Sequence, residues 1–357
     1  MEAVKLDLYK DFGYNNNTEI ANGIFWVGYA DKIASLCCNS YLITDHDEAV
    51  LIDSGSRDGF SSVMLKIMRT GFNPKNIIRL IYQHYDPDLC GNLPQMESLI
   101  KNDRLAVLSH IENNIFIDFY STKTKKECIS QQDFRFAFSS GRRLEFIQTP
   151  YAHTLGSFMT YDSQSKILFS SDIFGCYDSG WGLRTNIDES CADCEPGKIC
   201  PIKDRPCQVS SMVDFHKRIM SSKKALRYAL KKIDELDISI IAPQHGSLLH
   251  TPVSQRVCID RLKSLSRIGI ENYIQEEQAQ LNTLSSSGVE NYIREEQMQL
   301  KPLSGLGIEN YFREEQEQLK PLSGLGVENY IREEQAQMKP ISGLGIENYI
   351  RGEQAHE

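Results

Sequence analysis

The sequence contains no apolar run near the ~18 residues that a membrane-spanning helix needs, and its N-terminus lacks the pattern of a secretory signal. It also lacks a strip of basic residues that could neutralise the phosphates of a nucleic acid. We therefore expect no membrane partner and no nucleic-acid partner. Ten cysteines, spread unevenly along a chain without a secretory signal, predict a reduced protein of the cytoplasm.

Negative charge is confined to the C-terminal part of the chain. The net charge is −9, and residues 269–357 hold 7 Lys and Arg against 16 Glu and no Asp. Residues 1–268 hold 32 Lys and Arg against 32 Asp and Glu, so this part is neutral. The change in composition predicts a body of residues 1–268 and a tail of residues 269–357.

The body has the pattern of mixed strands and helices. With 357 residues and 41% hydrophobic content, the chain is long enough to bury at least one core. Amphipathic stretches at Phe60–Arg69, Leu93–Lys101 and Ser211–Leu236 predict helices. Short apolar runs bounded by turn residues predict strands, among them GIFWVG, NSYLIT, AVLID, IIRLIY, LAVLSH, LEFIQT, SFMTY and KILFSS. This mixture indicates a layered α/β fold.

The tail repeats a unit of nineteen residues, such as GIENYFREEQEQLKPLSGL, with the pattern of a short helix followed by a turn. The units begin at Gly269, Gly288, Gly307, Gly326 and Gly345. Similar units can stack into a solenoid. A recent duplication that leaves a frayed or disordered tail is the alternative, and the few apolar side chains of each unit fit it better.

Six His and Asp residues follow predicted strands, where loops on a rigid frame present their side chains. The stretch QHYDPDLCGN holds His84, Asp86 and Asp88 within five residues, and Pro87 excludes a helix there. The others are His153 in TPYAHTLGSF, Asp172 in ILFSSDIFG and His245 in IIAPQHG. One such residue alone is more often a cap or a loop residue. Three imidazoles and three carboxylates together suffice for two metal ions, with one carboxylate bridging.

The motifs around these residues resemble the metallo-β-lactamase superfamily, and within it the di-iron domain of flavodiiron proteins and the ODP-like oxygen-binding di-iron proteins. NSYLIT with VLIDSG is similar to the opening strands of that domain, and QHYDPDLCGNLP is similar to its HxExDHxGxLP ligand loop. TPYAHTLGSFMTYDSQSKILFSSDIFG is similar to the block that carries the next His and the bridging Asp. IIAPQHG is similar to the last ligand loop. The resemblance covers about residues 20–255. It implies an αββα sandwich and a homodimer; the tandem-repeat tail follows this sandwich in the chain.

Carried over position by position, the resemblance implies two iron ions, with zinc as the alternative. One metal would be held by His84, Asp86 and His153, the other by Asp88 and His245, with Asp172 bridging. Zinc hydrolases of the superfamily have His at the position of Asp86, and a harder carboxylate there favours iron.

Two residues depart from the family pattern. Asp86 replaces the usual Glu, and Leu89 stands where the motif has His, which leaves the second metal with three protein ligands and an open position. Cys90 could substitute as a ligand, although a half-buried small hydrophobe is its commoner role.

A cysteine-rich insertion, DESCADCEPGKICPIKDRPCQ, occupies about residues 188–208 of the resembling region. Its four thiols are Cys191, Cys194, Cys200 and Cys207. Four thiols so close in a reduced compartment predict a metal site, although unliganded thiols are the alternative. A structural Zn²⁺ and an iron–sulfur cluster both fit, and a cluster could pass electrons to the di-iron site.

The resemblance implies a site that binds dioxygen or nitric oxide. One hypothesis is an oxygen sensor with a signalling partner protein, for which the tail would be a multivalent docking segment. Another is an oxidoreductase of flavodiiron type; no Gly-rich phosphate loop is present, so we expect no FMN domain and an external electron donor. A di-metal hydrolase of esters or phosphodiesters is the alternative, although Asp86 and Leu89 remove two imidazoles expected of zinc hydrolases. The last hypothesis is a purely structural scaffold, and the six ligand-type residues argue against it.

Overall fold

The computed structural model describes residues 16–31, 36–120, 123–177, 182–192, 194, 197, 199–200, 206–275 and 277–278. The chain divides into two units, Met1–Glu277 and Gln278–Glu357. The first unit contains all six candidate residues. Of the expected repeats, the structure describes only residues 269–275 and 277–278, so the folding of the repeats stays a prediction.

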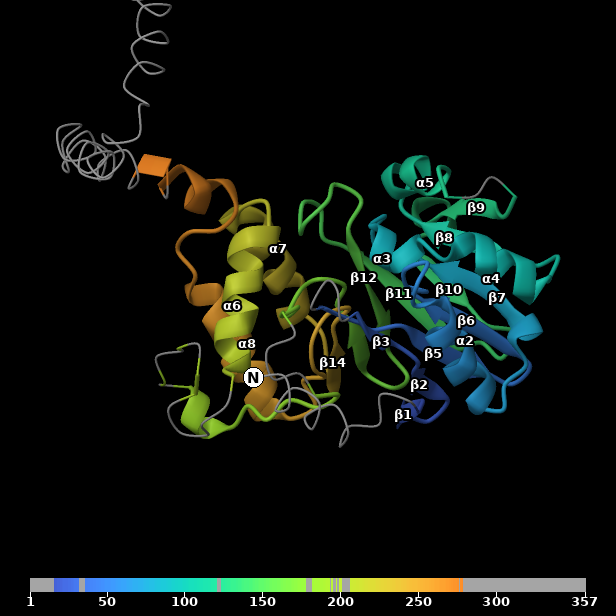
Figure 1. Ribbon diagram of the computed structural model, residues 1–357, viewed down its shortest axis with the longest axis horizontal. Helices are drawn as coiled ribbons and strands as arrows, with labels where there is room; N and C mark the ends of the chain where they lie inside the picture. The colour runs from blue at the N-terminus through green and yellow to red at the C-terminus, as the bar shows by residue number, and fades with distance from the viewer. Residues whose placement is uncertain are drawn as a thin grey trace, which may run out of the picture. The chain divides into compact units, whose positions relative to one another are not determined.

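Two β-sheets lie in the middle of the first unit (Figure 1). The larger has the strand order β1 (Thr18–Ala21), β2 (Ile24–Trp26), β5 (Tyr41–Asp45), β6 (Glu48–Ile52), β7 (Ile77–Ile81), β8 (Ala106–Ser109) and β9 (Lys125–Cys128). The smaller has the order β10 (Arg135–Ala137), β11 (Arg143–Gln148), β12 (Phe158–Asp162), β13 (Ile167–Phe169) and β14 (Ile240–Ala242). A separate sheet pairs β3 (Tyr29–Asp31) with β4 (Leu36–Cys38). Each of the eight apolar runs that predicted strands overlaps a strand of the structure.

Helices cover the outer face of each sheet (Figure 1). On the larger sheet these are α2 (Phe60–Arg69) and α4 (Leu93–Ile100), and on the smaller sheet α6 (Gln208–Ile219), α7 (Lys223–Asp234) and α8 (Pro252–Ser264). Shorter elements are α3 (Pro87–Cys90), α5 (Ile111–Ile117), η1 (Pro74–Asn76), η2 (Ile129–Gln132) and η3 (Glu189–Cys191). The result is a mixed α/β fold in helix–sheet–sheet–helix order, which agrees with the expected layering.

Alternating side chains along the strands build the cores between these layers. Leu42 packs with α2 and α4 on the outer face of the larger sheet, whereas its neighbour Ile43 packs between the sheets. On the smaller sheet, Phe158 faces the inner core and Met159 faces the helices α6, α7 and α8. Both sheets are therefore covered on both faces, which fixes the ends of their strands as a rigid frame.

Two helix expectations were wrong. Pro87 does not exclude a helix: it is the first residue of α3, where a proline removes only an N–H that has no helical partner. The stretch expected as one helix over Ser211–Leu236 is instead the pair α6 and α7. Met220 is extended, and the hydroxyl of Ser222 accepts a hydrogen bond from the amide of Ala225, which starts α7 anew.

The first residues of the tail pack on the body. Gly269 has a φ of +57°, and its amide donates a 2.9 Å hydrogen bond to the carbonyl of Lys217 at the end of α6. A Cβ at this position would lie 2.1 Å from the carbonyl oxygen of Met220, so the position requires glycine. The start of the tail is thereby fixed against the turn between α6 and α7.

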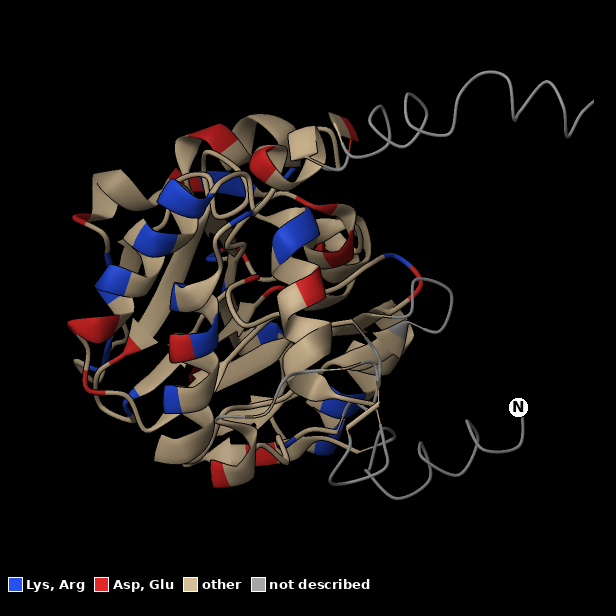
Figure 2. Cartoon of the chain, turned by 90° about the vertical axis from the view of Figure 1, so that its left-hand side faces the viewer, with Lys and Arg blue, Asp and Glu red and all other residues tan. Residues whose placement is uncertain are grey.

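Charged residues of both signs are interspersed on the helices seen in Figure 2. Among the described residues, no helix is both long and apolar enough to cross a membrane.

Candidate metal centre

The six candidate residues come together from four segments that follow strands. His84, Asp172 and His245 each lie three residues beyond the end of a strand, namely β7, β13 and β14. The pair β13 and β14 is parallel, so the loops that follow them leave the same edge of the sheet. The other three are Asp86, which caps α3, Asp88 in the first turn of that helix, and His153 in the loop between β11 and β12.

The carboxylate of Asp172 lies between two groups of side chains. Its Oδ2 is 3.0 Å from Nε2 of His153 and 3.9 Å from Nε2 of His84. Its Oδ1 is 3.7 Å from Nε2 of His245. Each oxygen thus faces a different group, which is the arrangement that a carboxylate bridging two metal ions requires.

The first group contains His84, Asp86 and His153, whose ligand atoms all lie within 4.8 Å of one another. Oδ2 of Asp86 is 3.4 Å from Nε2 of His153 and 3.8 Å from Nε2 of His84. Two imidazoles and one carboxylate therefore converge beside Oδ2 of Asp172.

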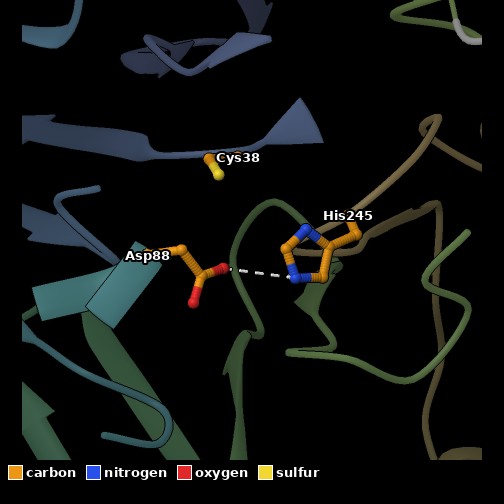
Figure 3. A group of neighbouring side chains, drawn as sticks. All are labelled: Cys38, Asp88 and His245. Carbon is orange, nitrogen blue, oxygen red and sulfur yellow. Dashed lines mark ion pairs between the residues drawn. The ribbon is translucent and has the colours of Figure 1, made fainter. Parts of the chain in front are cut away.

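The second group contains Cys38, Asp88 and His245, again with ligand atoms within 4.8 Å of one another (Figure 3). Oδ2 of Asp88 is 3.3 Å from Nε2 of His245. Sequence reasoning placed Asp88 and His245 here but missed Cys38, which is the last residue of β4. No local sequence motif identifies Cys38 as a residue of the site. Contacts between segments far apart in the chain bring it close to His245.

Oδ1 of Asp172 is a buried polar atom of this centre that has no hydrogen-bond partner among the described residues. Such atoms are rare in folded proteins, because desolvating an unpaired polar group is costly. His84, Asp172 and His245 are 1%, 2% and 5% exposed. A buried, convergent donor set with an unsatisfied atom fits metal ions.

The charges of the centre also fit a cation. Burial would lower the pKa of His153, but the carboxylates of Asp172 and Asp86 raise it to about 10. Burial likewise opposes ionisation of Asp172, yet the imidazoles of His84, His153 and His245 hold its pKa well below its ordinary value. The Asp172 carboxylate thus depends on neighbouring positive charge, and a proton on His153 supplies what a metal ion would supply.

Hydrogen bonds to the far nitrogen of two imidazoles direct Nε2 toward the centre. Nδ1 of His245 donates a 2.8 Å hydrogen bond to the carbonyl of Cys37. Nδ1 of His84 lies 3.0 Å from the hydroxyl oxygen of Ser171. Partners of this kind fix the orientation and tautomer of metal-binding histidines.

Asn39 fixes the loop that carries His245, and sequence reasoning missed it. Its Nδ2 donates to the carbonyls of Pro243 (2.9 Å) and Gly246 (2.8 Å), and its Oδ1 accepts from the indole of Trp26 (2.8 Å). The amide of Gln244 in this loop also reaches the centre, since its Nε2 donates to Oδ2 of Asp88 over 2.9 Å. The second group is therefore held by polar contacts from both sheets.

Helix α6 supports the loop of Asp172. Nε2 of His216 accepts a 3.0 Å hydrogen bond from the amide of Phe174, and its Nδ1 donates to the carbonyl of Met212. Burial lowers the pKa of His216 to about 4, so its imidazole is neutral at pH 7 and can accept this bond. The backbone that follows Asp172 is thus held to the helix.

The positions of Leu89 and Cys90 bear on the open position expected at the second metal. Leu89 is fully buried in the outer core under α2 and α4. The thiol of Cys90 donates to the carbonyls of Tyr85 and Asp86, both at 3.2 Å. Neither of the close groups of ligand atoms in the described residues includes Cys90.

The four cysteines of the insertion lie near one another, although neither close group of ligand atoms includes them. Cys191, Cys200 and Cys207 line one small pocket, and an antiparallel bridge between Ile199 and Pro206 brings the last two together. Partial burial and the thiols of Cys200, Cys207 and Cys191 raise the pKa of Cys194. All ten cysteines of the chain are described, and none forms a disulfide.

The chain is similar to proteins of known kinds. It is 28% identical over 218 residues to diflavin flavoprotein A 1 of Synechocystis, covering 61% of this chain and 35% of that protein. It is 27% identical over 168 residues to the anaerobic nitric oxide reductase flavorubredoxin of Enterobacter, covering 44% of this chain and 34% of that protein. The chain thus spans about a third of the length of these relatives.

The fold has a counterpart among solved structures. The peroxy di-iron species of the chemotaxis sensor ODP superimposes with a TM-score of 0.56 at 21% identity, over 73% of this chain and 97% of that one. The family model for the ODP family beta lactamase matches residues 36–246, which include all six candidate residues. Since that match covers more than half of the sequence, the chain belongs to the ODP family of β-lactamase-like proteins.

Proposed function

We propose that this protein binds two iron ions and uses them to bind and activate or reduce dioxygen or nitric oxide. The observation that carries the proposal is the placement of Asp172, whose Oδ2 faces the His84 group while its Oδ1 faces His245. A carboxylate in this position is what two neighbouring metal ions require. The names of the relatives, a nitric oxide reductase and a di-iron chemotaxis sensor, support the same chemistry.

In this proposal His84, Asp86 and His153 hold the first ion, Asp88 and His245 hold the second, and Asp172 bridges. Bound ferrous ions supply the electrons and the open coordination that a diatomic ligand needs. The protein supplies the frame: Ser171 and the carbonyl of Cys37 orient two imidazoles, and Gln244 orients Asp88. The deep burial of His84, Asp172 and His245 limits the access of water to the inner side of the centre.

Hydrolysis is the less favoured alternative. A zinc hydrolase of this superfamily has imidazoles at the positions of Asp86 and Leu89. Leu89 instead fills the outer core, and a carboxylate at position 86 adds negative charge that makes a metal-bound water less acidic. The similar proteins named above are di-iron or flavin proteins, which also supports iron.

Sensing and reduction use the same centre and differ in what supplies electrons. A sensor forms one adduct and reports it to a signalling partner, whereas a reductase needs a continuous external donor. We propose that the acidic repeats of residues 269–357 serve as the docking segment for that partner, joined to a metal-binding body of residues 1–268 in a homodimer. We also propose that the protein works in the reducing setting of the cytoplasm.

We further propose that Cys191, Cys194, Cys200 and Cys207 hold a structural Zn²⁺ or an iron–sulfur cluster. Their clustering beside one pocket supports this proposal. Acid-labile sulfide in anaerobically purified protein distinguishes the cluster from zinc. A variant with all four cysteines changed to Ser lacks this site. The difference in metal content between the wild type and this variant gives the metal bound by the four cysteines.

The test of the main proposal begins with anaerobic purification and a count of iron and zinc per chain. We expect two iron ions beyond any metal in the cysteine site, and a change in the visible spectrum when air is admitted. One reversible, stoichiometric adduct indicates a sensor, and steady consumption of O₂ or NO with a supplied donor indicates a reductase. A centre that is empty, or filled by zinc that does not respond to dioxygen, contradicts the proposal.

Substitutions identify the residues responsible. His153→Ala and Asp172→Ala should each lower the iron content, because they remove a ligand of the first ion and the bridge. The matched control is His250→Ala, since His250 lies in the same region of the fold but only approaches the carbonyl of Leu248 at 3.5 Å. Unchanged iron content in both site variants would contradict the assignment.

A further inference from the structure

The second metal position has fewer protein ligands than the first. In the proposed assignment the first ion has His84, Asp86, His153 and the bridging Asp172, whereas the second has Asp88, His245 and the bridge. The family motif fills this gap with an imidazole at position 89. Here position 89 holds a leucine, whose side chain has no ligand atom and is fully buried in the outer core.

Cys38 lies where that missing ligand is needed. Its sulfur, Oδ of Asp88 and Nε2 of His245 form a group whose atoms all lie within 4.8 Å of one another. Figure 3 shows the sulfur on the end of β4 directed toward the space between the Asp88 carboxylate and the His245 ring. Cys38 is 2% exposed, so this thiol faces the interior rather than solvent.

The backbone around Cys38 is fixed to the loop that carries His245. The carbonyl of Cys37 accepts the Nδ1 hydrogen of His245, and the amide of Asn39 donates a 2.8 Å bond to the carbonyl of Gln244. Because the residues on both sides of Cys38 are bonded to the two residues 244 and 245, the thiol and the imidazole keep their separation. This rigidity is what a metal site requires of its ligands.

The charge count supports a thiolate at this place. Two divalent ions bring four positive charges, and Asp86, Asp88 and Asp172 bring three negative ones. A thiolate at Cys38 would make the buried centre neutral, and an uncompensated charge in a buried site is costly. It would also give each ion four protein ligands.

We propose, on the basis of the proposed di-metal function, that Cys38 is a thiolate ligand of the second metal ion. On binding, the S–H bond breaks, the proton leaves to solvent and a sulfur–metal bond forms, without any change of oxidation state. The two positions then differ in kind. The first is made of nitrogen and oxygen, whereas the second includes a soft sulfur that favours softer metals.

The experiment loads the full chain with Co²⁺ and compares the wild type with Cys38→Ser. A thiolate bound to Co²⁺ gives a sulfur-to-cobalt charge-transfer band in the near ultraviolet. The four cysteines of the insertion contribute equally to both proteins, so they cancel in the difference spectrum. We expect the difference to show a band of one thiolate, and the affinity for the second ion to fall by at least about 100-fold, since changing even an outer residue of a metal site costs 10–100-fold.

Two further cysteines serve as controls. Cys128→Ser changes a thiol of similar burial whose sulfur contacts the hydroxyl of Ser130 (3.1 Å), and it should leave the band and the affinity unchanged. Cys90→Ser changes the thiol next to Asp86 and Asp88 in the chain. Loss of the band in Cys90→Ser but not in Cys38→Ser would overturn the proposal.

A measurement on the unaltered protein covers the case in which Cys38→Ser does not fold. In ¹¹³Cd NMR each thiolate moves the cadmium resonance to higher frequency, so sites with no sulfur, one sulfur and four sulfurs are resolved in one spectrum. A one-sulfur resonance supports the proposal. Two ions bound at the centre with only sulfur-free resonances would overturn it while leaving the di-metal function intact. If the wild type binds metal at the insertion alone, the di-metal function itself has failed.

Discussion

His84 and Ser171 join the two sheets directly at the candidate metal centre. His84 follows β7 of the larger sheet and Ser171 follows β13 of the smaller one, and Nδ1 of the imidazole lies 3.0 Å from the hydroxyl oxygen. Both residues are 1% exposed. The contact therefore orients an imidazole of one sheet against the loop of the bridging carboxylate on the other.

Replacing Ser171 by Ala should weaken metal binding while leaving all six ligands in place. Without its partner, the His84 ring can rotate, and loss of such a partner typically costs about 10–100-fold in affinity. Isothermal titration with Fe²⁺ or Co²⁺ measures the change. Ser254→Ala is the control, because it removes a buried hydroxyl from the cap of α8 and should lower stability without changing affinity.

Replacing Asn39 by Ala should lower the free energy of unfolding by about 2–4 kcal/mol, because it removes three buried hydrogen bonds. These bonds join the Asn39 side chain to the indole N–H of Trp26 and to the carbonyls of Pro243 and Gly246. Urea unfolding measures the loss. The control is Asn73→Ala, which removes an exposed cap of η1 and should lower the free energy of unfolding much less. Equal losses in the two variants would mean that Asn39 does not hold the loop of His245 in place.

Lys66 should make stability depend on pH above neutrality. Its ammonium is buried, donates to the carbonyl of Gly28 and lies 3.9 Å from the centre of the Trp26 ring. Burial lowers the pKa of Lys66 from 10.5 to about 7. Above pH 7 the unfolded chain keeps a proton that the folded chain has lost, so the free energy of unfolding rises with pH. Below pH 7 Lys66 is protonated in both states, and the folded protein bears the full cost of burying the charged ammonium.

The comparison is between the wild type and Lys66→Met. From pH 7 to pH 9 the free energy of unfolding of the wild type should rise by about 2 kcal/mol relative to the variant. Chemical denaturation at several pH values measures the difference. Lys75→Met, at an exposed position, should follow the wild type, and parallel curves for Lys66→Met would show that Lys66 keeps its ordinary pKa.

Metal ions should stabilise the fold, and a chelator should reverse the effect. Binding to the folded chain alone adds about 2.7 kcal/mol when the free metal is 100 times its dissociation constant. Thermal unfolding under anaerobic conditions measures the shift. Asp172→Asn should lose most of it, because the bridging charge is gone; a full shift in this variant would place the stabilising metal elsewhere.

Much of the fold and the centre could be predicted from local patterns. His84, Asp172 and His245 each follow an apolar run that forms a strand, and the strand ends bring them together. A rule applied too broadly produced the error at Pro87, because proline excludes the interior of a helix but not its first position. The break between α6 and α7 depends on the capping hydroxyl of Ser222. The amphipathic pattern of the sequence does not indicate this helix boundary.

The residues that could not be predicted act through long-range contacts. Asn39 contacts Pro243 and Gly246, more than 200 positions away, and Cys38 meets His245 through the same pairing. Asn39 lies in the strand motif NSYLIT. The neighbouring sequence does not show whether its side-chain amide holds a distant loop or only belongs to a turn residue. Such partners are set by the register between distant segments, and only the three-dimensional structure gives that register.

Gly269 is attached to the same helix that steadies the bridging carboxylate. Its amide bonds to Lys217, and the adjacent His216 receives the amide of Phe174, two residues after Asp172. Neighbouring residues of α6 therefore hold both the start of the acidic tail and the backbone that follows Asp172.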